Sequence, residues 1–203
     1  MTRARHLIVF VKAPRYGAVK TRLARDVGRL KAWTFHRRCL AQTVRRLARD
    51  RRWRTWLAVT PDRAARNFRP RASGARVIAQ GGGDLGERMA RAFARQYARA
   101  PGPAVLIGGD IPGVRPAHIA EALRRLGAFD VVFGPAADGG YWLVGFREPP
   151  PLGIFEGVRW SGPHALSDTL ANLSGFKVAP PLETLHDVDD GAALARVTAS
   201  CAL

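Results

Sequence analysis

The chain has few cysteines, few lysines and no long apolar run, and each scarcity excludes a class of protein. Its two cysteines, Cys39 and Cys201, lie far apart among 203 residues and match no metal-ligand or redox spacing. This excludes a disulfide scaffold and favours a reducing, cytoplasmic location. The apolar run before Lys12 is too short for a secretion signal, and no later run approaches the ~20 apolar residues of a membrane span. We therefore expect a cytoplasmic protein without membrane insertion.

Acidic residues are scarce in the first half, where positions 1–100 carry 26 basic and 5 acidic side chains. The remaining positions carry 7 basic and 11 acidic ones, so the net charge of +17 is concentrated in the first half. Only four of the 33 basic residues are lysines, a bias that a GC-rich genome explains. The basic excess lies largely on expected helices, whose solvated faces carry charge. This argues against nucleic acid as a partner and favours a site between a phosphorylated donor and a metal.

Apolar runs and helical stretches alternate along the chain, which predicts a three-layer α/β/α fold with a central, mostly parallel sheet. The run His6–Val11 is typical of a strand buried on both faces. Further strands are expected at 53–60, 75–79, 104–108, 130–134 and 141–146, the last two as a pair around an Asp-Gly-Gly turn. Helices are expected at 20–49 with a break near Gly28, at 85–99, at 116–126, from an N-cap at Ser161 to about 174, and from Asp190 onward. No linker or repeat divides the pattern, so we expect one domain over residues 1–203.

A basic loop follows the first strand and runs into a helix, an arrangement that offers backbone N–H groups and a positive dipole end to an anion. Its residues Lys12, Pro14, Gly17, Lys20 and Arg22 are candidates for nucleotide binding, and the Arg22 guanidinium can hold a phosphate with two hydrogen bonds. The loop matches neither the Walker pattern nor GxGxxG. An ordinary loop in a basic protein is the alternative interpretation.

Two glycine-rich segments follow later strands, at the carboxyl ends where ligands bind in open α/β sheets. In the Gly-Gly-Gly run after the third strand, Gly82 allows close approach of a ligand to the backbone, and Asp84 is either a nucleotide contact or a helix cap. After the fourth strand, Gly109 and Asp110 bring a carboxylate where it can hold Mg²⁺ against a diphosphate. A turn or capping role is the alternative for Asp110.

Further carboxylates lie in the acidic half at Asp138, Asp187 and Asp189. In an extended segment Asp187 and Asp189 project to the same side, where they repel each other unless a cation or a proton lies between them. They are therefore candidates to share a Mg²⁺ or Mn²⁺ ion with Asp110. Capping of the last helix is the alternative, which suits Asp190 better. By local chemistry alone, Asp138 in its Asp-Gly-Gly turn is most simply a turn former.

Convergence of Asp110, Asp187 and Asp189 without a metal has predictable consequences. We expect at least one raised carboxyl pKa, or an arginine recruited as a surrogate cation. We also expect Asp110→Asn to abolish turnover and stabilisation by metal while leaving the metal-free fold intact, because it removes one of several repelling charges. Replacement of Asp190 should cost only a helix cap, about 1 kcal/mol.

Six ordered motifs then carry a resemblance that spans about 5–197: KxPxxGxVKTRL, QGGGDLGERM, GGDIPG, GPAADGGYWLVG, VRWSGP and HDVDD. In this order they resemble a bacterial GT-A-like family of the nucleotide-diphospho-sugar transferase superfamily. That family is mostly called a domain of unknown function, and one branch is labelled arsenosugar-biosynthesis glycosyltransferase. The VKTRL and DGG elements are also similar to 2-phospholactate guanylyltransferases, which share the fold and transfer a nucleotidyl group.

The resemblance implies a Rossmann-like GT-A domain whose first loop and QGGGDLG segment hold the nucleotide. It implies that Asp110 coordinates Mg²⁺ or Mn²⁺ and, by likeness to the guanylyltransferases, that Asp187 and Asp189 complete the metal site. The acceptor side would be formed within the GPAADGGYWLVG and VRWSGP motifs by Gly139, Gly140, Tyr141, Trp160 and Ser161. Two features depart from glycosyltransferases. Pro112 replaces the second Asp of the usual Asp-any-Asp pair, and the extra mass that often forms an acceptor site is missing.

Three functions follow as hypotheses. The first is a metal-dependent transferase that uses a nucleoside-diphosphate sugar and a small-molecule acceptor, with Asp110 holding the metal and Asp138 orienting or deprotonating the acceptor hydroxyl. The second is a nucleotidylyltransferase that joins an NTP to a phosphorylated small molecule and releases pyrophosphate. The third is a non-catalytic polyanion-binding module that uses the basic helix over 34–54.

Overall fold

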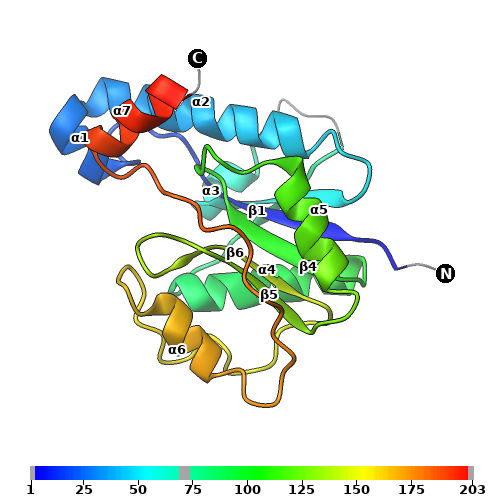
Figure 1. Cartoon of the computed structure of the whole chain (residues 1–203). Coiled ribbons are helices and arrows are strands. Elements are labelled where there is room, and N and C mark those ends of the chain that lie inside the picture. The colour runs from blue at the N-terminus through cyan, green and yellow to red at the C-terminus, as the bar shows by residue number, and fades with distance from the viewer. Residues whose placement is uncertain (1–2, 69–73, 201–203) are drawn as a thin grey trace.

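A six-stranded sheet forms the middle of the protein, in the order β3-β2-β1-β4-β6-β5 (Figure 1). The computed structural model describes residues 3–68 and 74–200, so Cys201 lies outside the described residues. The strands are β1 His6–Lys12, β2 Arg54–Thr60, β3 Arg76–Ala79, β4 Ala104–Gly108, β5 Val131–Pro135 and β6 Tyr141–Phe146. Strands β3, β2, β1 and β4 pair in parallel, whereas β6 runs antiparallel to both β4 and β5. The mostly parallel sheet and the β5–β6 pair are therefore confirmed.

Helices cover both faces of this sheet (Figure 1). They are α1 Thr21–Val27, α2 Arg29–Leu47, α3 Asp62–Ala65, α4 Leu85–Arg99, α5 Pro116–Arg125, α6 Ala165–Ala171 and α7 Gly191–Ser200. On one face α2 and α5 bury Leu40, Val44 and Ile119 against the strands, and on the other α4 buries Met89 and Phe93. Because apolar side chains alternate between the two faces of each central strand, both layers pack on the same sheet. The three-layer α/β/α fold is confirmed.

Local signals set the ends of several helices as expected. Gly28, at φ 84°, separates α1 from α2 at the expected break. Asp84 caps α4 through a capping box with Glu87, and the Asp190 carboxylate accepts a hydrogen bond from the Ala193 backbone N–H at 2.7 Å at the start of α7. No helix in the described part of the chain has the length and apolar character needed to cross a membrane.

The helix expected to begin at Ser161 starts later, and that prediction is wrong. The helix α6 begins only at Ala165, with His164 at its N-cap position. Ser161 has a φ of 63°, and Pro163 disfavours helical backbone at the residue before it. The chain therefore forms a loop over 161–164, and Ser161 is free to face the interior of the site.

Candidate active site

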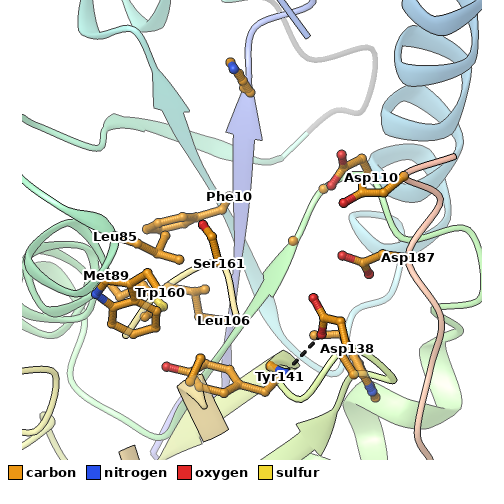
Figure 2. Close-up of a pocket in the computed structure, with 18 of the residues that line it drawn as sticks. Phe10, Leu85, Met89, Leu106, Asp110, Asp138, Tyr141, Trp160, Ser161 and Asp187 are labelled. Carbon is orange, nitrogen blue, oxygen red and sulfur yellow. Dashed lines mark hydrogen bonds between the residues drawn. The ribbon is translucent and has the colours of Figure 1, made fainter. Parts of the chain in front are cut away.

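A cavity of about 510 Å³ opens at the carboxyl ends of β1 and β4, beside the start of β6. Figure 2 shows its two unlike sides: Asp110, Asp138 and Asp187 lie on one, and Phe10, Leu85, Met89, Leu106 and Trp160 lie on the other. This is the edge at which open α/β sheets bind ligands, because parallel strands deliver their following loops to the same place. The site is therefore built mainly from loops that follow strands.

Most of the residues selected from the sequence line this cavity. They are Lys12, Lys20, Arg22, Gly109, Asp110, Asp138, Gly140, Tyr141, Trp160, Ser161, Asp187 and Asp189. The others lie outside its lining, in the same loops: Pro14, Gly17, Gly82, Asp84 and Gly139. Segments as distant in sequence as the first loop and the HDVDD motif thus meet at one site.

Asp110 is held at the end of β4 by the close packing of Gly109 against β1. The Gly109 backbone N–H donates to the Phe10 carbonyl at 2.9 Å. A Cβ at Gly109 would lie 2.7 Å from that carbonyl oxygen and 2.9 Å from Leu40 Cδ1. Only glycine therefore allows the loop to turn this tightly and to present Asp110 beside the first loop.

Lys20 lies between the carboxylates of two distant segments. Its Nζ is 2.9 Å from Asp110 Oδ2 and 3.1 Å from Asp189 Oδ1, and its side chain is only 9% exposed. Burial alone would lower the pKa of Lys20, but the two carboxylates outweigh burial and raise it above its ordinary value. Burial likewise acts to raise the pKa of Asp110, but His36 and Lys20 beside it lower that pKa below its usual range. Both groups are therefore charged, and they hold each other in place.

Asp187 is the carboxylate for which this arrangement provides no direct cation. Desolvation in the cavity raises its pKa from 3.8 to about 6, attraction to Lys20 opposes this rise, and repulsion from Asp110, Asp189 and Asp138 adds to it. The expected raised pKa is present. The surrogate cation is a lysine rather than the expected arginine, although Arg22 also lies 3.6 Å from Asp189.

His36 supports Asp110 from the opposite side, and no motif in the sequence indicates this role. It lies on α2, is 3% exposed, and its Nε2 is 2.9 Å from the Lys12 carbonyl oxygen. Its Nδ1 faces Asp110 Oδ2 at 3.7 Å and has no hydrogen-bond partner among the described residues. A lone histidine on a helix is ordinary in sequence, and only the packing of α2 against the first loop brings it to Asp110.

Asp138 is both a turn former and a cavity residue. Its Oδ1 accepts a hydrogen bond from the Gly140 backbone N–H at 3.0 Å, the local role that its Asp-Gly-Gly context suggested. The turn is tied to α6 because the Leu166 backbone N–H donates to the Gly139 carbonyl at 3.1 Å. The carboxylate nevertheless lines the cavity, where Figure 2 shows it near Asp187 and Tyr141.

A strap over residues 176–190 carries Asp187 and Asp189 from α6 back to the site (Figure 1). It runs beside β5, where the Leu182 and Leu185 backbone N–H groups donate to the carbonyls of Phe133 and Pro135 at 2.9 and 3.1 Å. These backbone hydrogen bonds fix the register of the strap against β5. They therefore also fix the positions of Asp187 and Asp189 in the site.

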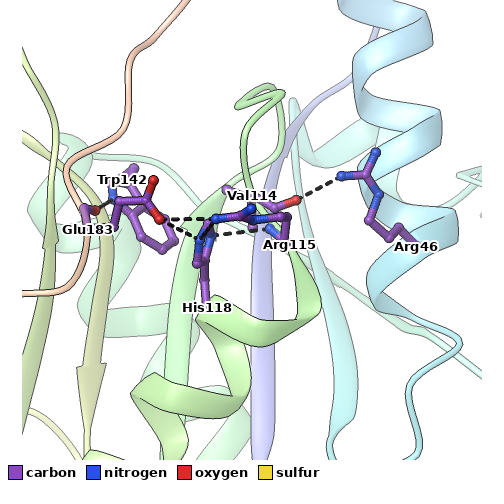
Figure 3. A network of polar contacts seen from close by, with 6 residues as sticks. All are labelled: Arg46, Val114, Arg115, His118, Trp142 and Glu183. Carbon is purple, nitrogen blue, oxygen red and sulfur yellow. Dashed lines mark hydrogen bonds and ion pairs between the residues drawn. The ribbon is translucent and has the colours of Figure 1, made fainter. Parts of the chain in front are cut away.

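Glu183 clamps the middle of the strap to α5 and β6, as Figure 3 shows. Its carboxylate lies 3.1 Å from both the Arg115 guanidinium and His118 Nε2. Its backbone carbonyl accepts a hydrogen bond from Trp142 Nε1 at 3.0 Å. Glu183, Arg115 and His118 lie outside the cavity lining, whereas Trp142 belongs to it.

Arg88 is a cavity cation that lies inside a quoted motif but was not selected from the sequence. Its Nη1 donates to Gln80 Oε1 at 3.0 Å, and its Nε donates to the Asp84 carbonyl at 3.0 Å. Gln80 is itself fixed, because its Nε2 donates to the Ala58 carbonyl at 2.8 Å. Both partners of Arg88 are neutral, so the guanidinium keeps its charge available to an anion in the cavity.

The carboxylate oxygens of this site are the type of ligand atom that a hard divalent cation binds. Carboxylate oxygens are the ligands that Mg²⁺ and Mn²⁺ prefer, and Asp110 and Asp189 already lie within reach of one cation, the Lys20 ammonium. Within the described ranges no three His, Cys, Asp or Glu side chains are arranged to hold a metal ion. The residues therefore fit a divalent cation by charge and ligand type, provided that Lys20 withdraws from between the carboxylates.

The fold and this cavity define a class of protein, the transferases that act with nucleotides. A solved structure of a candidate nucleotide-diphospho-sugar transferase from Desulfovibrio desulfuricans G20 matches 98% of this chain and 88% of that chain, with 31% identity and a TM-score of 0.88. The fold alone is shared with 4-diphosphocytidyl-2C-methyl-D-erythritol synthase from Anaerococcus prevotii DSM 20548, at 10% identity and a TM-score of 0.64 over 98% of each chain. It is also shared with Rv0371c from Mycobacterium tuberculosis H37Rv in a complex with manganese, at 17% identity and a TM-score of 0.54 over 98% of this chain and 100% of that chain.

The family can also be stated. Residues 43–162 match the family described as "Uncharacterized protein conserved in bacteria (DUF2064)", and the chain belongs to it. A comparison with curated proteins gives no match. The chain is thus an enzyme of the transferase class, and the resemblance inferred from its motifs is confirmed at that level.

Proposed function

We propose that the protein is a metal-dependent transferase that takes a sugar from a nucleoside-diphosphate sugar and passes it to a small-molecule acceptor. One observation carries this proposal. The carboxylates of Asp110 and Asp189, from segments 79 residues apart in sequence, share one buried ammonium at the mouth of a cavity that also contains Asp187 and Asp138. This many carboxylates do not stabilise the fold, because Asp187 has no direct cation. Binding of a further cation explains the cluster better.

The donor is proposed to lie across the first loop, with its diphosphate near the acids. Lys12, Arg22 and Arg88 line the cavity and supply positive charge to phosphate oxygens. Asp110, Asp187 and Asp189 would hold a Mg²⁺ or Mn²⁺ ion, which when bound neutralises the charge on the leaving diphosphate. Lys20 is poised to move from the carboxylates to a phosphate when the cation arrives, because its ammonium would otherwise compete for the same oxygens.

The acceptor is proposed to approach from the side of Asp138. Its hydroxyl oxygen forms a bond to the anomeric carbon of the donor sugar, and the bond from that carbon to the diphosphate oxygen breaks with its electron pair on the diphosphate. The acceptor proton passes to the Asp138 carboxylate. Gly139 and Gly140 shape the turn that presents this carboxylate, and Tyr141, Trp160 and Ser161 border the acceptor.

Nucleotidyl transfer is the second candidate, because Pro112 stands where glycosyltransferases have the second Asp of their Asp-any-Asp pair. In that reaction a phosphate oxygen of the second substrate attacks the α-phosphorus of an NTP, and the pyrophosphate leaves. The same cations and acids would serve. In sugar transfer the leaving diphosphate stays attached to the nucleoside, whereas in nucleotidyl transfer free pyrophosphate leaves.

Calorimetric titration with UDP-, GDP- and dTDP-sugars in the presence of Mn²⁺ tests the proposal. We expect saturable binding of at least one, lost in Asp110→Asn and kept in the matched control Asp50→Asn, whose ion pair with Arg52 lies outside the cavity. Absence of binding by any nucleotide sugar to the folded protein would contradict sugar transfer. Release of pyrophosphate on mixing NTPs with small phosphorylated compounds would instead support nucleotidyl transfer.

A further inference from the structure

We propose that the apolar side of the cavity binds an apolar ring or chain of the acceptor, so that the acceptor is an amphipathic alcohol rather than a polyhydroxylated sugar. This inference rests on the proposed function, which assigns the acceptor to this cavity. We define the apolar compartment by the cavity residues Phe10, Leu85, Met89, Leu106, Tyr141, Val144 and Trp160.

The apolar compartment lies over three neighbouring strands, beside the acids. Phe10, Leu106 and Val144 come from β1, β4 and β6, which are adjacent in the sheet. The helix α4 closes the compartment with Leu85 and Met89, and Figure 2 shows Trp160 beside them. A molecule in this space would have Asp138 at one end, because Tyr141 and Asp138 flank the same turn.

Several side chains of the compartment are only partly covered by protein. Phe10, Leu85, Tyr141 and Trp160 are each intermediate in exposure and pack against the core cluster under α4, to which the buried Met89, Leu106 and Val144 belong. Covering apolar surface gains about 25 cal/mol per Å², and a concave apolar wall is the usual lining of a small-molecule site. An apolar ligand group would remove that surface from water.

The walls are rigid, which suits a preformed site. Trp160 packs against Tyr141 and Phe155 with ring centroids 6.3 and 6.2 Å apart. A Cβ at Gly86 would lie 2.9 Å from Trp160 Cζ2 and 2.6 Å from Phe155 Cβ, so the absent side chain at Gly86 lets α4 pack directly on the indole. A ligand would therefore meet fixed rings and lose little affinity to reorganisation.

Polar groups that could bind a polyhydroxylated ring are few on this side. The Tyr141 hydroxyl is 3.4 Å from Thr169 Oγ1, and Thr169 donates its own proton to the Ala165 carbonyl, so Tyr141 is the donor of that pair. Tyr141 thus offers the ligand its ring. The Ser161 hydroxyl and the Trp160 indole N–H, which has no hydrogen-bond partner among the described residues, are too few for a ring that carries several hydroxyls.

A nucleobase is better served elsewhere in the cavity. Base edges need hydrogen-bond partners, and the loop 80–84 that follows β3, at the far edge of the sheet from β6, carries backbone N–H and carbonyl groups. The apolar compartment over β1, β4 and β6 is left for the other substrate.

Methionine labelling reports on this compartment directly, because Met89 and Met1 are the two methionines of the chain. Protein labelled with [¹³C-methyl]methionine gives two methyl signals, assigned with Met89→Leu. Titration without any nucleotide sugar uses 4-phenylbutan-1-ol, D-glucose and uridine as probes. We expect the phenyl alcohol to shift the Met89 signal saturably, with no effect of glucose or uridine.

Variants at the rim of the compartment sharpen the test. Leu85→Gln should weaken binding of the phenyl alcohol by about tenfold, equivalent to about 1.4 kcal/mol, whereas Leu85→Met and the exposed control Leu152→Gln should not. Leu85 begins α4 and is partly exposed, so a glutamine there keeps the helix.

Each contrary result overturns the inference in a recognisable way. A Met89 signal that no probe moves shows that the compartment is closed, and an equal response to glucose removes the preference for apolar groups. A shift caused by uridine makes the compartment a base subsite. Failure of the proposed function is detected separately, as absence of nucleotide-sugar binding while the Met89 response to the phenyl alcohol persists.

Discussion

Asp187→Asn and Asp110→Asn should change the free energy of unfolding in opposite directions, because Lys20 pairs directly with Asp110 but not with Asp187. At Asp187 the folded protein raises the carboxyl pKa from 3.8 to about 6, so the folded state binds more protons than the unfolded state between these values. The stabilisation that Asp187 contributes is therefore present below about pH 4 and is lost as the pH rises through 6. Asp187→Asn should remove that loss. The full shift corresponds to roughly 3 kcal/mol, but Asp187 is exposed in the cavity, and screening by solvent leaves about 1 kcal/mol.

Asp110→Asn should act in the opposite sense, which corrects the expectation that the metal-free fold would be unaffected. The substitution removes the carboxylate that lies 2.9 Å from the buried ammonium of Lys20 and leaves it with Asp189, whose side chain is 47% exposed. Loss of one partner of a largely buried charge costs about 1–3 kcal/mol. Asp110 is thus an attracted charge, whereas Asp187 is the repelled one.

Urea denaturation in the presence of a chelator measures both effects. At pH 7.5 we expect Asp187→Asn to be more stable than the wild type, Asp110→Asn to be less stable, and the control Glu156→Gln, at an exposed residue outside the cavity, to differ by well under 1 kcal/mol. Near pH 4 the gain from Asp187→Asn should vanish. A destabilised Asp187→Asn at pH 7.5, or a gain that does not depend on pH, would refute the account of this cluster.

Three further predictions follow from residues outside the acidic cluster. His6 is fully buried and accepts a hydrogen bond from Trp56 Nε1, and burial lowers its pKa from 6.5 to about 4, so stability should fall by up to about 3 kcal/mol as the pH drops from 6.5 to 4. His6→Gln, which keeps an acceptor, should flatten that part of a denaturation curve measured against pH; an unchanged slope would contradict the assignment. Glu183→Gln should weaken Mn²⁺ binding several-fold in calorimetry, with a stability cost below about 1 kcal/mol because its ion pairs with Arg115 and His118 lie near the surface; unchanged affinity would show that the clamp does not position the strap. Asp84→Ala should lower stability by about 1 kcal/mol through its capping box and leave nucleotide-sugar affinity unchanged, and a loss of affinity would return Asp84 to the nucleotide site.

The fold was largely predictable from the sequence because its signals are local. The buried runs that became β1 and β4 are continuous β-branched and aliphatic segments, and α4 begins at its capping aspartate and ends at Arg99 as expected. The loop at Ser161 was mispredicted because a serine before an apolar stretch resembles an N-cap, while the proline two residues later delays the helix. The four-residue α3 was too short to leave a periodic pattern.

The candidate site was only half predictable, because its partners are set by tertiary packing. Motif glycines and aspartates marked the loops, and the strand order then brought those loops together. Lys20 was selected for phosphate binding, but nothing in its sequence context indicates that it bridges Asp110 and Asp189. The position of His36 and the shape of the apolar compartment depend on how α2 and α4 pack on the sheet. An isolated histidine or leucine in a helical segment does not indicate such packing.

The most direct test of the central claim is a crystal structure of the protein soaked with Mn²⁺ and the nucleotide sugar that binds in calorimetry. Anomalous scattering at the manganese edge locates the ion without reference to the rest of the density. The account predicts one manganese peak bound by Asp110, Asp187 and Asp189, with the Lys20 ammonium moved from the carboxylates to a phosphate and the diphosphate against the first loop. A nucleotide bound outside this cavity, or an ordered diphosphate with Lys20 still bridging Asp110 and Asp189 and no manganese beside them, would contradict it.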